Sequence, residues 1–77
     1  MEDKTYIVQP FSRSGFMLPQ NDQFSDLDAA RRQATYYRRR YGKARVFDNW
    51  EDYERACQED EKARAEHIKA WREAERV

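Results

Sequence analysis

The sequence predicts a small α+β domain, 1–77, with the element order ββαβα. Three observations lead to this prediction. A segment rich in β-branched and aromatic residues lies at 5–11, apolar residues recur at helical spacing over 27–41, and a long charged segment follows position 48. We expect a sheet of two or three strands packed by one helix within 1–48, and a long charged C-terminal helix over 49–77.

Two of the predicted strands lie close to the N-terminus. The first is 5–11 (TYIVQPF), where Pro10 favours a sheet edge or a strand end because proline cannot donate to the strand ladder. Residues 12–15 (SRSG) have turn chemistry, and 16–18 (FML) can return as a short second strand before Pro19. A hairpin is the simplest arrangement, with a loop at 20–23 after it. A third short strand is predicted at 44–47 (ARVF).

The first helix has both a start signal and a stop signal. Ser25 followed by Asp28 resembles a capping box, which predicts a helix starting at Asp26, and Gly42 is a natural stop. The apolar residues between them are spaced three or four apart and form one stripe: Leu27, Ala30, Ala34, Tyr37 and Tyr41.

A second helix is expected to begin after Asp48 or Asn49, either of which can cap it. Its apolar face carries Trp50, Tyr53 and Cys57, is interrupted by charged residues, and resumes at Ile68 and Trp71. We expect the first two turns to pack on the sheet. The pairs Glu51–Arg55 and Asp60–Arg64 should support the rest. The end of this helix either projects, bends back or meets another chain.

Composition argues against several classes of protein. No stretch of about 18 apolar residues and no secretory signal is found, and the single Cys57 allows no internal disulfide, so we expect a cytoplasmic protein. Two separated glycines make no phosphate-binding loop, and one His with one Cys makes no usual zinc site. Cys57 and His67 lie about 15 Å apart along one helix, too far to act as a catalytic pair. No enzyme, cofactor or metal is expected.

Positive charge is concentrated in one segment of a chain whose net charge is zero. Segment 29–47 holds seven of the fifteen Lys and Arg residues, three tyrosines and no carboxylate. Helical geometry turns part of it away from the apolar stripe, namely Arg32, Tyr36, Arg39 and Arg40, and Lys43 and Arg45 extend the patch. Two interpretations remain open. The arginines either pair with the acidic second helix or form a partner-binding site.

A protein or nucleoprotein partner is favoured over free nucleic acid, because nucleic-acid-binding domains usually carry net positive charge. We therefore expect a non-catalytic regulator or inhibitor that binds protein. Direct nucleic-acid binding through the same face is one alternative. Self-association through a second interface at Ile68 and Trp71 is another, since these side chains are unfavourable in water.

The segment from Tyr6 to Phe47 resembles small bacterial and phage proteins that begin with a Tyr-x-Val-Gln-Pro-Phe strand. Here the matching residues are TYIVQPF, an Ala-containing helix and the strand ARVF. This resemblance implies an accessory protein of a phage or mobile element, which by analogy with anti-CRISPR proteins would act by occluding a host protein. The Val-Gln strand also looks similar to half of a peptidoglycan-binding SPOR domain, but the second repeat half is missing.

Overall fold

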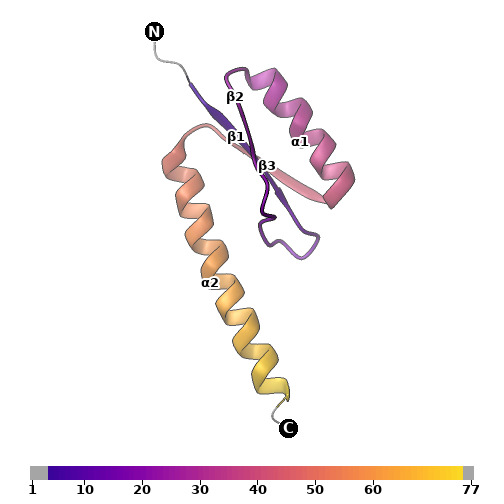
Figure 1. The fold of residues 1–77 in the computed structure, drawn as a ribbon, viewed down its shortest axis with the longest axis vertical. Coiled ribbons are helices and arrows are strands. Elements are labelled where there is room, and N and C mark those ends of the chain that lie inside the picture. The colour runs from indigo at the N-terminus through magenta and orange to yellow at the C-terminus, as the bar shows by residue number, and fades with distance from the viewer. Residues whose placement is uncertain (1–3, 76–77) are drawn as a thin grey trace.

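The computed structural model describes residues 4–75, which form a three-stranded antiparallel sheet and two helices (Figure 1). The elements follow in the order β1 (Tyr6–Phe11), β2 (Asp22–Phe24), α1 (Leu27–Tyr41), β3 (Lys43–Phe47) and α2 (Trp50–Glu75). The predicted α+β class and ββαβα order are confirmed. β1 is the central strand, between β2 and β3. The last two positions of the predicted helix 49–77 lie outside the described residues.

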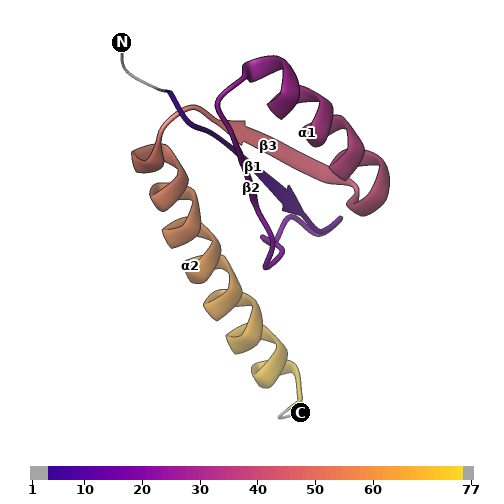
Figure 2. The ribbon, with the colours of Figure 1, turned by 45° about the horizontal axis from the view of Figure 1, so that its top comes forward.

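The two helices lie on opposite sides of the sheet, as Figures 1 and 2 show. Successive side chains of a strand point to opposite faces, so Val8 packs against α1 and Ile7 packs toward α2. The buried cluster on the α1 side is Val8, Ala30, Ala34, Tyr37 and Ala44. The cluster on the α2 side is Ile7, Met17, Phe47 and Ala56. The sheet therefore divides the core into two small clusters.

The predicted stripe and stop of the first helix are found in α1. Ala30, Ala34 and Tyr37 are its buried residues. Its N-cap is Asp26 rather than Ser25, because the Asp26 carboxylate accepts the first free backbone N–H groups of the helix. Gly42 ends the helix at φ 113°, and a Cβ there would lie 2.8 Å from Cγ of Arg13. Only glycine therefore fits this stop without strain.

The predicted position of the second strand, 16–18, is wrong. The turn at 12–15 forms, with Gly15 at φ 96°, but the returning segment makes only an isolated bridge between Phe11 and Met17. The second strand is β2, in a segment predicted as loop, and it pairs with β1 from Tyr6↔Phe24 to Val8↔Asp22. The pairing with β1 stops at Leu18, because the Leu18 carbonyl accepts from the Gln9 side chain at 2.8 Å and the next residue, Pro19, has no N–H to donate.

Pro10 lies near the end of the central strand, so the alternative of a sheet edge is wrong and that of a strand end is correct. The Pro10 carbonyl accepts a hydrogen bond from the Leu18 N–H at 3.1 Å, which directs the Pro10 backbone groups toward 12–18. β2 ends its pairing at Val8, before it reaches this position. The missing N–H of Pro10 therefore breaks no strand ladder.

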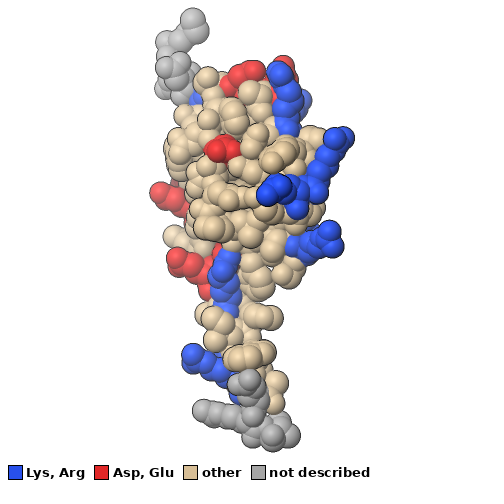
Figure 3. All heavy atoms as spheres, turned by 45° about the vertical axis from the view of Figure 1, so that its right-hand side comes forward, with Lys and Arg blue, Asp and Glu red and all other residues tan. Residues whose placement is uncertain are grey.

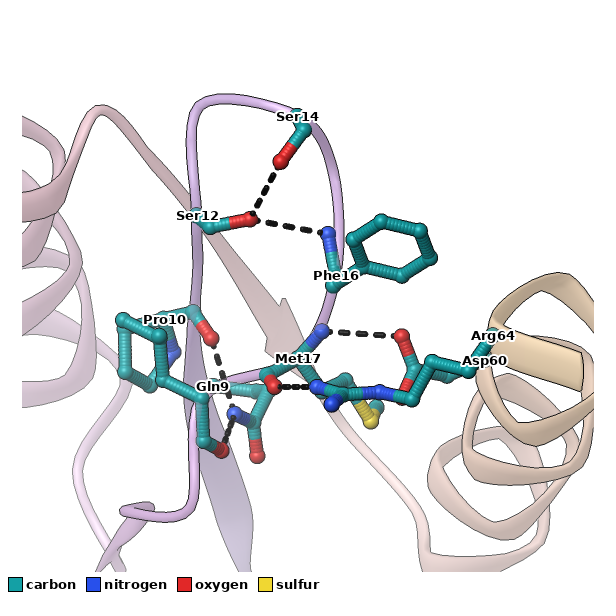
Figure 4. A network of polar contacts seen from close by, with 9 residues as sticks. Gln9, Pro10, Ser12, Ser14, Phe16, Met17, Asp60 and Arg64 are labelled. Carbon is teal, nitrogen blue, oxygen red and sulfur yellow. Dashed lines mark hydrogen bonds and ion pairs between the residues drawn. The ribbon is translucent and has the colours of Figure 1, made fainter. Parts of the chain in front are cut away.

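A polar contact fastens α2 to the segment 12–18 (Figure 4). The Met17 N–H donates to the Asp60 carboxylate at 2.8 Å, and the Arg64 guanidinium donates to the Met17 carbonyl. Arg64 also donates to Asp60 at 2.7 Å, so the predicted pair of these two residues is present. The Arg64 guanidinium further lies over the Phe16 ring, 5.4 Å from its centroid. Of the other predicted pair, Arg55 instead joins Asp52, at 3.7 Å.

The first turns of α2 pack on the sheet as expected, while its last turns project. Ala56 is buried and Tyr53 and Cys57 are half-buried against the sheet, but every position from Glu61 to Ala74 is exposed. The molecule is consequently elongated, with principal extents of 58 × 26 × 12 Å. Among the described residues, no helix has the length and apolar character needed to cross a membrane.

Candidate partner-binding site

The four residues predicted as the centre of a binding site share the side of α1 that faces away from the sheet. We call Arg32, Tyr36, Arg39 and Arg40 the outward face. All four are exposed, and the Tyr36 side chain retains 53% of its accessible surface. The helical repeat explains this position, since these residues lie opposite the buried alanines. Figure 3 shows Lys and Arg side chains projecting together from the side of the molecule where α1 lies.

Aromatic neighbours orient one of these arginines. Arg40 Nε donates to the Tyr41 hydroxyl at 3.2 Å, and the guanidinium lies 5.6 Å from the Tyr41 ring centroid. This hydrogen bond is the main cause that raises the pKa of Arg40 and lowers the pKa of Tyr41. Tyr36 lies 5.8 Å from Tyr37 between ring centroids. The outward face is therefore a charged surface beside a row of tilted tyrosine rings, Tyr36, Tyr37 and Tyr41.

The arginines of α1 do not pair with the acidic helix. Within 4–74, the ion pairs are Lys4–Asp48, Arg55–Asp52 and Arg64–Asp60, and none of them includes an α1 arginine. The sheet separates α1 from α2, which prevents such pairing. The interpretation in which the basic face is neutralised internally is therefore wrong for the described part of the chain.

Lys43 and Arg45, the predicted extension of the patch, lie on β3. Both are exposed. Arg45 turns toward the α2 side, where its guanidinium lies 4.7 Å from the ring centroid of Phe47. Since Phe47 belongs to the cluster under α2, Arg45 points to the opposite face of the sheet from α1. Lys43 and Arg45 thus lie beside a strand edge and do not continue the outward face.

A cleft of about 760 Å³ lies between α1 and the edge of β3. We call it the edge cleft. It is lined by Lys4, Tyr6, Leu27, Arg31, Ala34, Thr35, Arg38, Val46 and Asp48. The Thr35 hydroxyl donates to the Arg31 carbonyl at 3.0 Å, and the Arg38 guanidinium donates to the Ala44 carbonyl at 3.4 Å. Three polar α1 side chains therefore border this cleft.

Arg31, Thr35 and Arg38 are not among the site residues predicted from the sequence. Their spacing of four and three places them on one side of the helix, directly beside the apolar stripe. That position was the available signal, because polar residues bordering a buried stripe lie at the margin between a helix and its sheet. The strand order decides which edge of the sheet these three residues border. That order could not be predicted, because the position of β2 was predicted incorrectly.

The second predicted interface, Ile68 with Trp71, is exposed on the projecting part of α2. Ile68 retains 48% and Trp71 60% of their accessible surface. A shallow depression of about 500 Å³ beside them is lined by Ala65, Ile68, Lys69, Arg72 and Glu73. Of the three arrangements left open for this end of the helix, bending back on the domain is therefore wrong.

Among the described residues, no three His, Cys, Asp or Glu side chains gather closely enough to hold a metal ion. The five arginines of α1 are divided between the outward face, which has Arg32, Arg39 and Arg40, and the edge cleft, which has Arg31 and Arg38. Comparisons with protein-family models, with curated proteins and with solved structures found no match to this chain.

Proposed function

We propose that this protein is a non-catalytic regulator or inhibitor that binds an acidic surface of a protein or nucleoprotein through the outward face of α1. One observation supports the proposal above all others. The arginines of this face are exposed beside Tyr36 and form none of the ion pairs found within 4–74. Their charge is therefore available to a partner.

The residue types of the outward face suit protein recognition. Arginine donates two parallel hydrogen bonds to a carboxylate, and tyrosine offers a large, stiff contact area, so both are enriched among residues that dominate binding energy. The carboxylates of α2 lie beyond the sheet and the buried clusters. Charges farther apart than a Debye length of about 8 Å interact weakly at physiological salt, so α2 leaves much of this local field intact.

The test is affinity capture from a lysate of the organism that encodes the protein, followed by mass spectrometry. We expect a complex that survives moderate salt and is lost with Tyr36→Ala plus Arg39→Glu. Lys62→Glu is the matched control, because it makes the same change of charge at an exposed position on α2. Circular dichroism verifies the fold of each variant. Full capture by the folded double variant would refute the proposed function.

A second candidate function is direct binding of nucleic acid by the same face. The observation that favours it is the placement of the acidic helix across the sheet, which leaves a locally basic surface on a neutral chain. Phosphate binding through arginines weakens steeply as salt rises. A gel shift with duplex DNA, single-stranded DNA and RNA should then appear at about 50 mM salt and fade by about 200 mM. The absence of any shift at the lower salt removes this candidate.

A further inference from the structure

We infer that the free edge of β3 accepts an extended, acidic segment of the partner as a fourth strand, with its carboxylates directed to Arg31 and Arg38. The inference rests on the proposed function, because it specifies the form of the partner that the basic side of α1 would bind. It concerns the edge cleft, whose residues are distinct from the outward face. The two ideas can therefore fail separately.

The backbone of β3 presents hydrogen-bonding groups at an unpaired edge. The sheet order is β2-β1-β3, so within residues 4–75 β3 is paired on one side only. Pro10 directs its carbonyl toward Leu18 and is the register partner of Ala44. Ala44 therefore turns its N–H and C=O away from β1, and by the alternation of an antiparallel ladder Val46 does the same. The Ala44 carbonyl accepts a hydrogen bond from Arg38 at 3.4 Å, which uses one of its two lone pairs, and the N–H groups of Ala44 and Val46 point to the open edge. Outward N–H and C=O groups of this kind are a template for an added strand.

Space for that strand is found along both sides of the β3 edge. The edge cleft includes Val46 and Asp48, and a second cleft of about 450 Å³ includes Lys43, Ala44 and Arg45. A third hollow, of about 340 Å³, lies between β3 and the start of α2. Hydrogen-bonded strands lie about 4.8 Å apart, so an added strand would run directly between these hollows. The helices cover the faces of the sheet and leave this edge accessible.

The charges around the edge select an acidic segment. On the α1 side, Arg31 and Arg38 form no ion pair among the described residues, while Lys4 is 3.5 Å from Asp48. Side chains of a strand alternate in direction, so every second residue of the added segment would face these arginines. On the α2 side the hollow is lined by Arg45 and Arg55 but also by Asp48, Asp52 and Glu59, so this side does not favour an acidic side chain. The preference for carboxylates therefore comes from the α1 side alone.

A second copy of this chain is a poor occupant of the same edge. Pairing two β3 strands would bring Lys43 and Arg45 of both copies together, and like charges on neighbouring strands are destabilising. Basic side chains on an edge strand are also a common protection against self-pairing. The preference for an acidic segment comes instead from Arg31 and Arg38, on the α1 side of the edge.

The probe for the test is an acetylated and amidated seven-residue peptide that alternates Val and Glu. The control peptide replaces Glu with Lys. On titration into ¹⁵N-labelled protein, we expect the Glu peptide to shift the amide resonances of Ala44 and Val46 and to slow their hydrogen exchange. The Lys peptide should leave both unchanged. The absence of amide shifts in β3, or equal shifts with both peptides, would overturn the inference.

Variants separate the backbone contact from the charge contact. Val46→Pro removes an outward N–H without removing a bond to β1, so the fold should persist while peptide binding weakens at least tenfold. Val46→Ala retains the N–H and is the matched control, expected to stay within about threefold of the parent. Arg38→Glu should weaken binding about tenfold. If either Val46→Pro or Arg38→Glu binds the Glu peptide as tightly as the parent does, the peptide does not bind as an added strand beside β3.

The failure of the inference differs from the failure of the proposed function. Arg39 lies outside the edge cleft, so Tyr36→Ala plus Arg39→Glu should leave peptide affinity within about twofold of the parent. Loss of the peptide shifts in this double variant would overturn the proposed edge site. If the parent protein captures a partner but the Glu peptide does not shift the amide resonances of β3, only the proposed edge site is wrong.

Discussion

Asp60 links α2 to the segment that precedes β2, although it lies on a helix surface rich in charge. Its side chain is only 11% exposed and accepts both the Met17 N–H and the Arg64 guanidinium. Asp60→Ala would leave the Met17 N–H without this acceptor. We predict a loss of about 2 kcal/mol in the free energy of unfolding, measured by urea denaturation.

The matched control for Asp60 is Asp52→Ala. Asp52 also pairs with an arginine of α2, Arg55, but half of its side chain is exposed and the two partners are three residues apart on one helix. Exposed pairs of this kind contribute little, but Asp52 also accepts from Asn49 Nδ2 at 3.0 Å in the first turn of α2, so we expect a cost of about 0.5–1 kcal/mol, clearly below that of Asp60→Ala. Equal costs for the two substitutions would show that the Met17 contact does not stabilise the fold.

Tyr37 provides a prediction about pH. Burial, followed by the hydrogen bond that its hydroxyl donates to Asp22, raises the pKa of Tyr37 above its ordinary value of 10.0. A raised pKa means that the native state favours the neutral phenol. The stability from this group is present below pH 10 and is lost as pH rises through the raised pKa. Tyr37→Phe should therefore be less sensitive to alkali than the parent.

Urea denaturation of the parent and Tyr37→Phe from pH 8 to 11 measures this difference. Tyr41, whose pKa is lowered by Arg40, contributes in the opposite direction in both proteins, and only its charge interaction with Tyr37, the smallest cause of the Tyr37 shift, differs between them. At pH 8 the variant should be less stable by about 1 kcal/mol, because it lacks the hydrogen bond to Asp22. If the difference in the free energy of unfolding between the parent and Tyr37→Phe stays constant up to pH 11, the raised pKa of Tyr37 does not affect stability and the prediction is wrong.

At the scale of single residues, the sequence predicted which side chains form local contacts but not which distant residues they contact. Asp60 and Arg64 were predicted as a pair because they are one helical turn apart. Their contact with Met17 spans more than 40 positions of sequence and arises only once α2 lies across the sheet. The outward orientation of Tyr36 followed from the helical repeat alone, which is why that part of the site could be predicted.

At the scale of elements, strong periodicity was sufficient for the helices and insufficient for β2. The apolar stripe and Gly42 defined α1 through local signals. β2 has the sequence DQF and no buried residue, and it exists because its backbone pairs with β1. The segment 16–18 has the more strand-like residues, but the Leu18 carbonyl accepts from the Gln9 side chain and Pro19 has no N–H, so its pairing with β1 stops after one bridge. Backbone pairing with β1 thus determined which segment became a strand.

The projecting half of α2 should contribute little to stability. Ile68 and Trp71 each retain about half or more of their accessible surface. We predict that Ile68→Ser plus Trp71→Ser changes the free energy of unfolding by less than about 0.5 kcal/mol. Phe47→Ala, at a buried position of β3, provides the contrast and should cost about 3 kcal/mol. Urea denaturation distinguishes the two.

The same double variant tests self-association through α2. If Ile68 and Trp71 join copies of the chain, light scattering will give a larger mass for the parent than for the variant. Their charged neighbours are Lys69, Arg72 and Glu73. Equal monomer masses for both proteins would exclude this interface as the basis of an oligomer.

At the scale of the whole molecule, shape is the most direct test of the projecting helix. The radius of gyration over Cα atoms is 15.0 Å. A compact domain of this length would have a value of roughly 11–12 Å. Small-angle X-ray scattering should therefore give a value near the larger figure at low protein concentration. A radius of gyration of roughly 11–12 Å would mean that the end of α2 folds back in solution.

The direction of α2 determines how this protein should be attached to a surface or a label. The helix carries the chain away from the sheet, whereas Lys4 borders the edge cleft. A C-terminal tag would hold the outward face and the β3 edge toward solution, and an N-terminal tag would stand beside the cleft. Immobilisation through the C-terminus is consequently the orientation in which binding measurements leave both surfaces accessible.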